Sequence, residues 1–259
     1  MSNFCEFYNN IINLISFVAI IPRLKYMESI VMSFHKIKLA IYALFLTNYF
    51  GFKLKQKRDS VEKKRMRLEY SETLLKKLKI SVEVENEDRL PKEGQYLIVS
   101  NHRGIIDPLI IEIALKKTSI FGLWISKKEL YNSPFFGLFV RNAGGVLLDR
   151  EKSQMSGFFA DIKKGVKEGS SIFIFPEGTR NKGEASLLEF KEGARIIALK
   201  NRLPILPVYI KTHTDKALGS SLNDKNIRQT ITIKIGDMID YRKKGDLEKL
   251  YREMFDSLH

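Results

Sequence analysis

Short runs of β-forming residues alternate with charged or amphipathic segments from residue 94 onward, and this alternation restricts the possible folds. Six runs predict strands, at 96–100, 120–126, 145–149, 171–175, 205–211 and 229–235. Four other segments predict helices, at 108–117, 151–168, 188–201 and 246–257. Alternating strands and helices pack as a sheet covered by helices. We therefore predict an α/β domain over residues 81–259, with a central, mostly buried sheet flanked by helices.

The first 80 residues have a different pattern, in which an apolar run is followed by a basic one. Residues 39–52 carry no charged side chain, whereas residues 53–80 carry eleven Lys and Arg but only four Asp and Glu. The resulting +7 is half of the net charge of +14 of the whole chain. A basic segment beside an apolar one is typical of attachment to anionic membranes. We therefore predict membrane-associating helices over 1–80, an apolar one at 39–52 and a basic one at 53–80.

Three arrangements are open for the apolar run, because its 14 residues are fewer than the roughly 20 that span a bilayer as a helix. It can lie in the membrane interface, form part of a marginal spanning anchor, or pack in the protein core. The basic helix can lie on anionic lipid or stand in solvent, with an apolar stripe at every seventh residue: Leu54, Val61, Leu68 and Leu75. The apolar neighbour favours lipid over nucleic acid. We expect attachment to the cytoplasmic face of the inner or plasma membrane and no nucleic-acid partner.

Four loops after predicted strands carry chemically useful side chains. The first is Asn-His-Arg-Gly-Ile-Ile-Asp-Pro, in which His102 precedes Asp107 by five residues. That step would place the two side chains on different faces of a helix, so they can meet only across a turn. A carboxylate bound to one ring nitrogen leaves the other nitrogen to accept a proton. Alternatively, Asp107 only caps the next helix and His102 is an ordinary loop residue.

The other three loops differ in how much chemistry they offer. The segment 144–150 begins with two glycines and ends in Asp-Arg, and the segment 203–209 is rigidified by prolines. The segment 175–180, Phe-Pro-Glu-Gly-Thr-Arg, places a carboxylate, a flexible backbone, a hydroxyl and a guanidinium within four residues. This set suits binding of a phosphate or of a developing oxyanion. A plain turn with Pro176 at its second position is the simpler alternative.

Together, these loops resemble the motifs of the lysophosphatidic acid acyltransferase family, the 1-acylglycerol-3-phosphate acyltransferases. The family's four motifs match, in order, the segments 102–107, 145–150, 175–180 and 203–209, the third without any change. Lesser matches fall between them at 126–130, 134–137 and 190–194, and the resemblance covers about residues 94–211. Two positions depart from the family, because Gly104 and Asn181 stand where serine is frequent.

The resemblance implies transfer of a fatty acyl group from acyl-coenzyme A or acyl carrier protein to the sn-2 hydroxyl of lysophosphatidic acid. The product would be phosphatidic acid, for phospholipid biosynthesis. It implies that His102 is the general base and that Asp107 orients its ring. The substrate phosphate is expected to bind basic side chains, namely Arg150, Arg180 and Lys128. The loop at the oxyanion is expected to be formed by Glu177, Gly178 and Thr179. No metal ion and no cofactor beyond the acyl donor are implied.

Other functions are open at this point. A relative of the same family could use another lyso-lipid, in lysophospholipid remodelling or aminolipid synthesis. A non-enzymatic basic protein that binds a membrane or nucleic acid would have no use for His102, Asp107 and Glu177 in loops at strand ends. A serine hydrolase is disfavoured because the chain contains no Gly-x-Ser-x-Gly. A disulfide framework or a cysteine-built zinc site is excluded by the single cysteine, Cys5.

Overall fold

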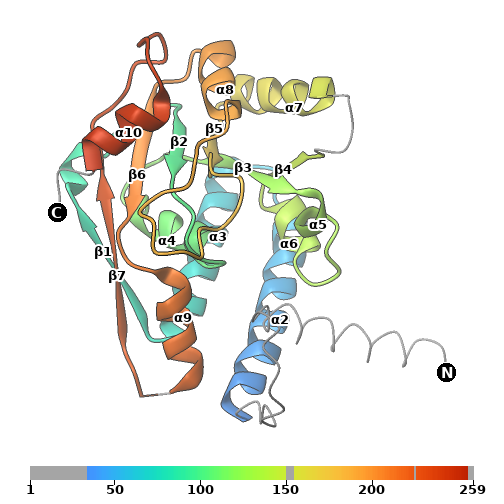
Figure 1. Cartoon of the computed structure of the whole chain (residues 1–259). Helices are drawn as coiled ribbons and strands as arrows, with labels where there is room; N and C mark the ends of the chain where they lie inside the picture. Colours follow the sequence, from blue (N-terminus) through green and yellow to red (C-terminus); the bar gives the residue numbers. More distant parts are fainter. Residues whose placement is uncertain (1–33, 150–154, 225, 256–259) are drawn as a thin grey trace.

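A computed structural model describes residues 34–149, 155–224 and 226–255, and over these residues its centre is a seven-stranded sheet (Figure 1). The strands lie in the order β1-β7-β6-β2-β5-β3-β4. Their bounds are β1 Ile80–Glu85, β2 Leu97–Ser100, β3 Gly122–Lys127, β4 Gly145–Leu148, β5 Ser171–Ile174, β6 Ile205–Ile210 and β7 Gln229–Ile235. All six predicted strands are confirmed, and β1 is an additional strand that the prediction lacks.

Strand direction gathers several loops at one edge of the sheet. The neighbours β6, β2, β5, β3 and β4 run parallel to one another. β7 is antiparallel to β6, and β1 is parallel to β7. Within the register, Val99 of β2 lies between Ile174 of β5 and Pro207 of β6. Because parallel strands end at the same edge of a sheet, the loops that follow β2, β5, β3 and β4 meet there.

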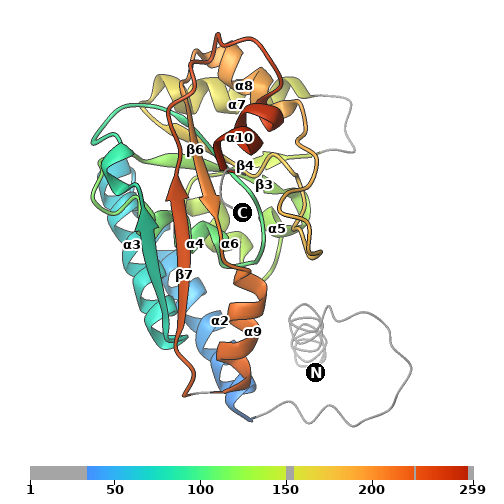
Figure 2. The ribbon, with the colours of Figure 1, turned by 60° about the vertical axis from the view of Figure 1, so that its left-hand side comes forward.

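Helices cover both faces of the sheet (Figures 1 and 2). The helices are α2 Phe34–Lys55, α3 Ser60–Lys77, α4 Asp107–Ala114, α5 Lys128–Tyr131, α6 Gly137–Asn142, α7 Met155–Lys167, α8 Gly193–Asn201, α9 Thr214–Asn223 and α10 Leu247–Phe255, with a 3₁₀ turn η1 at Glu87–Arg89. Leu97 and Val99 pack into the hydrophobic cluster beneath α7, α8 and α10, whereas Ile98 packs into the cluster beneath α2, α3 and α4. Successive residues of a strand point to opposite faces, so β2 is buried on both. The predicted α/β architecture with a flanked central sheet is confirmed.

Several helices differ from the prediction, and for one of them the hydrogen bonds explain the difference. The predicted helix 188–201 begins only at Gly193, because backbone N–H groups before it have partners elsewhere. The N–H of Leu188 donates to Glu177 (2.9 Å) and that of Lys191 to the carbonyl of Pro176 (2.9 Å). The helix α7 lies within the predicted 151–168, of which 151–154 are outside the described residues. The predicted helix 108–117 ends already at Ala114, and α5, α6 and α9 are absent from the prediction.

The prediction of one basic helix over 53–80 is wrong. The helix α2 runs through the apolar segment and ends at Lys55, and α3 begins at Ser60. Between them, the side chain of Asp59 caps α3 by accepting a hydrogen bond from the N–H of Glu62 (3.2 Å). The chain then leaves α3 and enters β1 at Ile80, where apolar and polar residues alternate as in a half-buried strand.

The helix α2 is buried on one side and apolar on the other. Leu39, Phe50 and Leu54 pack in the same cluster as the sheet residue Ile98. The opposite face exposes four large apolar side chains: Ile41, Phe45, Tyr49 and Phe52. Among the helices that the structure describes, none combines the length and the apolar character needed to cross a membrane.

Two of the basic side chains in the segment 53–80 point into the protein. Arg67 is only 2% exposed, forms an ion pair with Glu112 of α4, and donates to the carbonyls of Gly122 (2.7 Å) and Ala143 (3.0 Å). Lys64 donates to the carbonyls of three residues, namely Leu115, Thr118 and Ile120. Burial lowers the pKa of Lys64 to about 8. These two cations hold α3 on the sheet and do not belong to a solvated or lipid-facing surface.

Candidate active site

The candidate site lies where the carboxyl ends of β2, β5, β3 and β4 meet (Figure 1). His102 follows β2, and Lys128 is the first residue after β3. The segment 175–180 follows β5 directly, and Asp149 follows β4. The topology therefore brings the loops after β2 and β5, Lys128, and Asp149 of the segment 144–150 to a single edge of the sheet, whereas most of the segments 144–150 and 203–209 forms β4 and β6.

His102 and Asp107 are in contact across the turn that separates β2 from α4. Nδ1 of His102 lies 2.8 Å from Oδ2 of Asp107, whose side chain is completely buried. Since a carboxylate can only accept, Nδ1 carries the proton and Nε2 keeps a lone pair. The His102 side chain is 19% exposed, so substrate can reach it. The pair therefore has the arrangement of a general base held by a carboxylate.

The carboxylate of Asp107 has four hydrogen-bond donors. Oδ2 accepts from the ring of His102 and from the backbone N–H groups of Arg103 (2.6 Å) and Gly104 (2.8 Å). Oδ1 accepts from the hydroxyl of Thr214, the first residue of α9, at 2.5 Å. Asp107 also begins α4, where a negative charge is favoured by the helix dipole. Of the two alternatives drawn from the sequence, the contact with the histidine is the one present: Asp107 is the first residue of α4, but Ile106 holds the N-cap position and no side chain caps the helix.

Glu177 ties the loop after β5 to the loop after β2. Its side chain is buried, and its two oxygens accept from the backbone N–H groups of His102 (2.7 Å) and Leu188 (2.9 Å). Burial raises the pKa of Glu177, and these two hydrogen bonds oppose that rise. A third link runs the other way, because the N–H of Asn181 donates to the carbonyl of His102 (2.7 Å). The two loops therefore form one rigid unit around the histidine.

The backbone conformation at Gly178 explains why this position of the motif is a glycine. Its φ is +66°, in the left-handed region, and its N–H donates to the carbonyl of Phe175 (2.9 Å) to close a turn. Thr179, next along the turn, is exposed and Arg180 is half-buried. Both follow Glu177, whose hydrogen bonds fix the first part of the loop, and both are at least partly accessible to solvent.

Aromatic rings support the imidazole from below. The ring of Phe175 stacks on that of His102, with centroids 4.0 Å apart and planes at 9°. Trp124 of β3 stacks in turn on Phe175 at 5.3 Å, and its indole N–H donates to Glu112 (3.0 Å). Because Glu112 is the partner of Arg67, the buried ion pair of α3 and α4 lies beneath the histidine stack.

The predicted phosphate-binding residues are placed unevenly. Lys128 Nζ lies 3.5 Å from Oδ2 of Asp149, so two of the loops are linked by charge. Arg180 lies in the loop after β5, at the same sheet edge. Arg150 lies outside the described residues, and its predicted role stays a prediction.

Sequence reasoning missed several residues that build the site. The guanidinium of Arg103 is turned away from the histidine and donates to the carbonyls of Ala185 (2.9 Å) and Ser186 (2.9 Å). The side chain of Asn101 donates to the carbonyl of Ile210 (3.0 Å) and accepts from its N–H (2.8 Å). Both stand beside His102 in the first motif, which was a usable signal. Thr214 had none, because it lies 107 residues beyond its partner.

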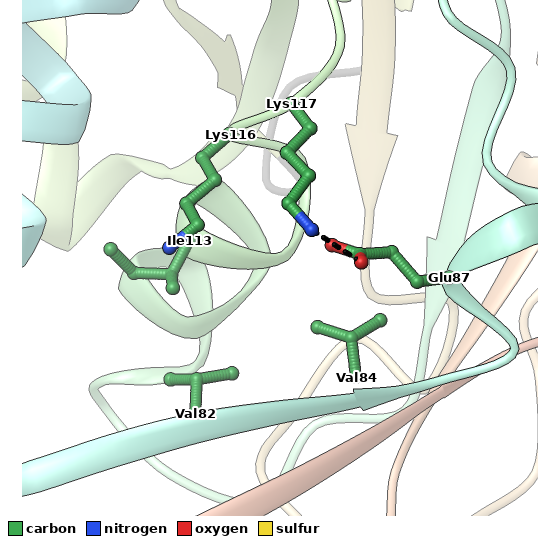
Figure 3. A pocket seen from close by; sticks show the side chains of 6 residues that line it. All are labelled: Val82, Val84, Glu87, Ile113, Lys116 and Lys117. Atoms are coloured by element: carbon green, nitrogen blue, oxygen red, sulfur yellow. Dashed lines mark hydrogen bonds and ion pairs between the residues drawn. The ribbon is translucent and has the colours of Figure 1, made fainter.

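The hollow drawn in Figure 3 is separate from this site. It has a volume of about 240 Å³ and lies between β1 and the end of α4 opposite to Asp107. Its lining residues are Val82, Val84, Glu87, Ile113, Lys116 and Lys117, and Lys117 pairs with Glu87 at 2.6 Å. Among the described residues, no group of three or more His, Cys, Asp or Glu side chains is placed to hold a metal ion.

Comparison with known proteins agrees with the motifs. The 1-acyl-sn-glycerol-3-phosphate acyltransferase of Helicobacter pylori is 40% identical over 118 residues, which are 45% of this chain and 48% of that protein. The protein of the same name from Borreliella burgdorferi is 30% identical over 172 residues, 66% of each chain. The aligned part thus spans about half to two thirds of the length of these relatives.

The fold also has a solved counterpart. The crystal structure of the 1-acyl-sn-glycerophosphate (LPA) acyltransferase, PlsC, from Thermotoga maritima superposes with a TM-score of 0.64 at 23% identity, covering 90% of this chain and 93% of that one. This similarity supports the α/β fold with its flanked sheet. The model of the family described as Acyltransferase matches residues 81–211, half of the 259 residues, and includes all four motif loops. The chain therefore belongs to the acyltransferase family, as the four loops led us to expect.

Proposed function

We propose that the protein is a 1-acyl-sn-glycerol-3-phosphate acyltransferase that uses acyl-coenzyme A or acyl carrier protein as acyl donor. Its acceptor would be the sn-2 hydroxyl of lysophosphatidic acid, and its product phosphatidic acid for phospholipid biosynthesis. The observation that carries this proposal is the 2.8 Å contact of His102 and Asp107 at the sheet edge where the motif loops meet. The relatives from Helicobacter pylori and Borreliella burgdorferi bear this name, which supports the choice of acceptor.

In the proposed reaction, Nε2 of His102 removes the proton from the acceptor hydroxyl. The alkoxide oxygen attacks the carbonyl carbon of the thioester, so that a C–O bond forms and a tetrahedral oxyanion develops. Collapse of this intermediate breaks the C–S bond, and the departing thiolate takes the proton from the imidazolium. The negative charge of Asp107 stabilises the imidazolium between these two transfers. The scheme uses no metal ion, no cofactor apart from the acyl donor and no covalent acyl-enzyme.

The loops beside the pair suit the charged parts of the reaction. Arg180 follows β5 and Lys128 follows the neighbouring strand β3, so both cations are candidates to bind one phosphate, with Arg150 proposed from its motif alone. The N–H of Gly178 is bonded within its turn. We therefore assign stabilisation of the oxyanion to the backbone N–H groups of Thr179 and Arg180, in a loop that Glu177 holds in place.

The test of this function compares acceptors that differ only in the phosphate. Purified full-length protein in detergent micelles is given a labelled acyl-coenzyme A or acyl carrier protein, with lysophosphatidic acid or a monoacylglycerol of the same chain. We expect phosphatidic acid from the first acceptor and a kcat/KM at least about 10-fold lower for the second, because charged hydrogen bonds contribute about 1.5–3 kcal/mol. Acylation confined to the acceptor without phosphate would overturn the proposal. Preference for another lysophospholipid would move it to that acceptor.

We also propose that α2 attaches the protein to the cytoplasmic face of the inner or plasma membrane. Its exposed apolar residues Ile41 (48% exposed), Phe45 (71%), Tyr49 (53%) and Phe52 (61%) are spaced by three or four positions and so share one face. Lys53 and Lys55 stand at the end of the same helix, where they can meet anionic headgroups. Such a face, unpartnered within the described residues, suits a helix lying in the membrane interface. The acceptor is itself a membrane lipid, so attachment would bring enzyme and substrate together.

A double substitution of Phe45 and Phe52 with serine tests this attachment. We expect binding to vesicles of mixed zwitterionic and anionic lipid to weaken at least about 10-fold, because each buried Phe contributes about 1.5–3 kcal/mol. Vesicle sedimentation of the full chain measures the effect. The control is Val61→Ser, which removes an apolar side chain that is 72% exposed on α3. Equal loss in both variants, or in neither, would contradict the assignment to α2.

A further inference from the structure

We propose that Thr214 is a positioning residue that completes a His102–Asp107–Thr214 triad, in which its hydroxyl fixes the carboxylate that holds the general base. Thr214 lies at the start of α9, beyond residues 81–211 of the family match, and none of the motifs contains it. The inference rests on the proposed function for its kinetic consequences. The contact itself is independent of which lipid is acylated.

The geometry singles out this hydroxyl. Its Oγ lies 2.5 Å from Oδ1 of Asp107, and both side chains are completely inaccessible to solvent. The other oxygen, Oδ2, accepts from His102, Arg103 and Gly104. Within the described part of the chain, Thr214 is thus the donor to Oδ1, and no water can take its place without opening the site. A buried carboxylate oxygen that loses a charged hydrogen bond is strongly destabilised.

Gly104 makes room for the threonine. A Cβ on Gly104 would stand 2.5 Å from Oγ of Thr214 and 2.9 Å from the backbone nitrogen of Asp215. The first distance is too short for any real contact, and the second atom belongs to a backbone that cannot swing away. A side chain at position 104 would therefore push the start of α9 off Asp107. The threonine of α9 therefore reaches Asp107 because position 104 carries no side chain.

Loss of the Thr214 hydroxyl should shift proton uptake by the His102–Asp107 pair in the same direction, whichever of the two residues takes the proton. Without the hydroxyl, the anionic carboxylate is less stabilised, so proton uptake by the His102–Asp107 pair becomes easier on either partner. The titratable and charged groups around the pair are Arg103 in its own loop, Glu177 and Arg180 after β5, and His213 and Asp215 at the start of α9. Substitutions at Thr214 leave all of them in place. A change in the pH dependence of kcat in a Thr214 variant would therefore be due to loss of the hydroxyl.

The experiment compares Thr214→Val, which keeps the shape but lacks the hydroxyl, with Thr214→Ser, which keeps the hydroxyl. For Thr214→Val we expect kcat to fall by about 10-fold at little change in KM, and the acidic limb of the pH profile to move up by about one unit. Thr214→Ser should restore both. Gly104→Ala, which displaces Thr214 from the other side, should reproduce the Thr214→Val profile. An unmoved acidic limb in Thr214→Val would overturn the proposal, even if that variant were less stable.

A second measurement does not depend on catalysis. NMR of histidine-labelled protein follows the ring of His102, whose signal is assigned by its loss in His102→Gln. In Thr214→Val this ring should titrate at higher pH than in the unaltered protein and in Thr214→Ser. If the unaltered protein acylates no lysophosphatidic acid but the ring responds in this way, the proposed function fails and the triad stands. If the ring does not respond while acyl transfer proceeds, the triad fails and the function stands.

Discussion

Replacement of His102 with alanine should lower the rate of acyl transfer by about 10²- to 10⁴-fold, the range that a general base contributes. The reason is that its Nε2 is the proton acceptor left over once Nδ1 is bound to Asp107 at 2.8 Å. The substitution should affect kcat rather than KM, since the imidazole acts on the reacting hydroxyl and not on the acyl chain or the phosphate. Transfer of labelled acyl groups to lysophosphatidic acid measures both constants.

The surroundings of His102 allow a sharper form of this test. In the alanine variant, the space that the imidazole ring occupied is left empty. It lies between the carboxylate of Asp107 and the ring of Phe175, which stacks on the imidazole at 4.0 Å. Added imidazole should bind there and restore part of the rate in His102→Ala, but should not change the unaltered protein. As a control, Lys117→Ala removes a surface ion pair with Glu87 at the far end of α4 and should keep full activity. Normal acyl transfer by His102→Ala without imidazole would end the proposed mechanism.

The motif loops could be predicted because their chemistry is local. In each, a short string after a β-rich run carries the groups, and the parallel order of β2, β5, β3 and β4 then brings the strings together. Strand runs were readable because both faces of the central strands are buried and therefore apolar. What local patterns could not supply was the partner at long range. Thr214 meets Asp107 only because α9 folds back over the first motif loop, and nothing in its own neighbourhood indicates that.

The segment 53–80 shows a second limit of prediction from sequence, because its charged side chains were all expected to face solvent or lipid. Of the sevenfold stripe Leu54, Val61, Leu68 and Leu75, Leu54 and Leu75 are buried, whereas Val61 is 72% exposed. The buried residues of α3 are instead Met66, Arg67, Tyr70, Ser71, Leu74 and Leu75, which recur at three- and four-residue steps. A buried arginine and a buried serine break the apolar pattern. The burial of Arg67 depends on Glu112, Gly122 and Ala143, which lie far along the chain.

Loss of Arg67 should be the most damaging single change to stability among these residues. In Arg67→Met, the carboxylate of Glu112, only 7% exposed, would keep the indole N–H of Trp124 as a partner but lose its cation. Breaking a buried ion pair by removing one partner costs about 3–5 kcal/mol, because the remaining charge is uncompensated. Urea unfolding measures this loss, and the fluorescence of the chain's single tryptophan reports it from within the affected cluster.

The double variant Arg67→Met/Glu112→Gln separates charge from packing. Glutamine keeps an acceptor for the indole of Trp124 and removes the buried charge, so the double variant should recover about 2 kcal/mol relative to Arg67→Met. Arg65→Met is the matched control, because this arginine is exposed on the same helix and its loss should change the free energy of unfolding by less than about 0.5 kcal/mol. Equal stability of Arg67→Met and Arg65→Met would mean that the pair does not hold α3 on the sheet. Trp124 also stacks on the Phe175 ring, which in turn stacks on His102, so a disturbance of the buried ion pair would reach the active site. We therefore expect kcat to fall together with stability in Arg67→Met and to recover in the double variant.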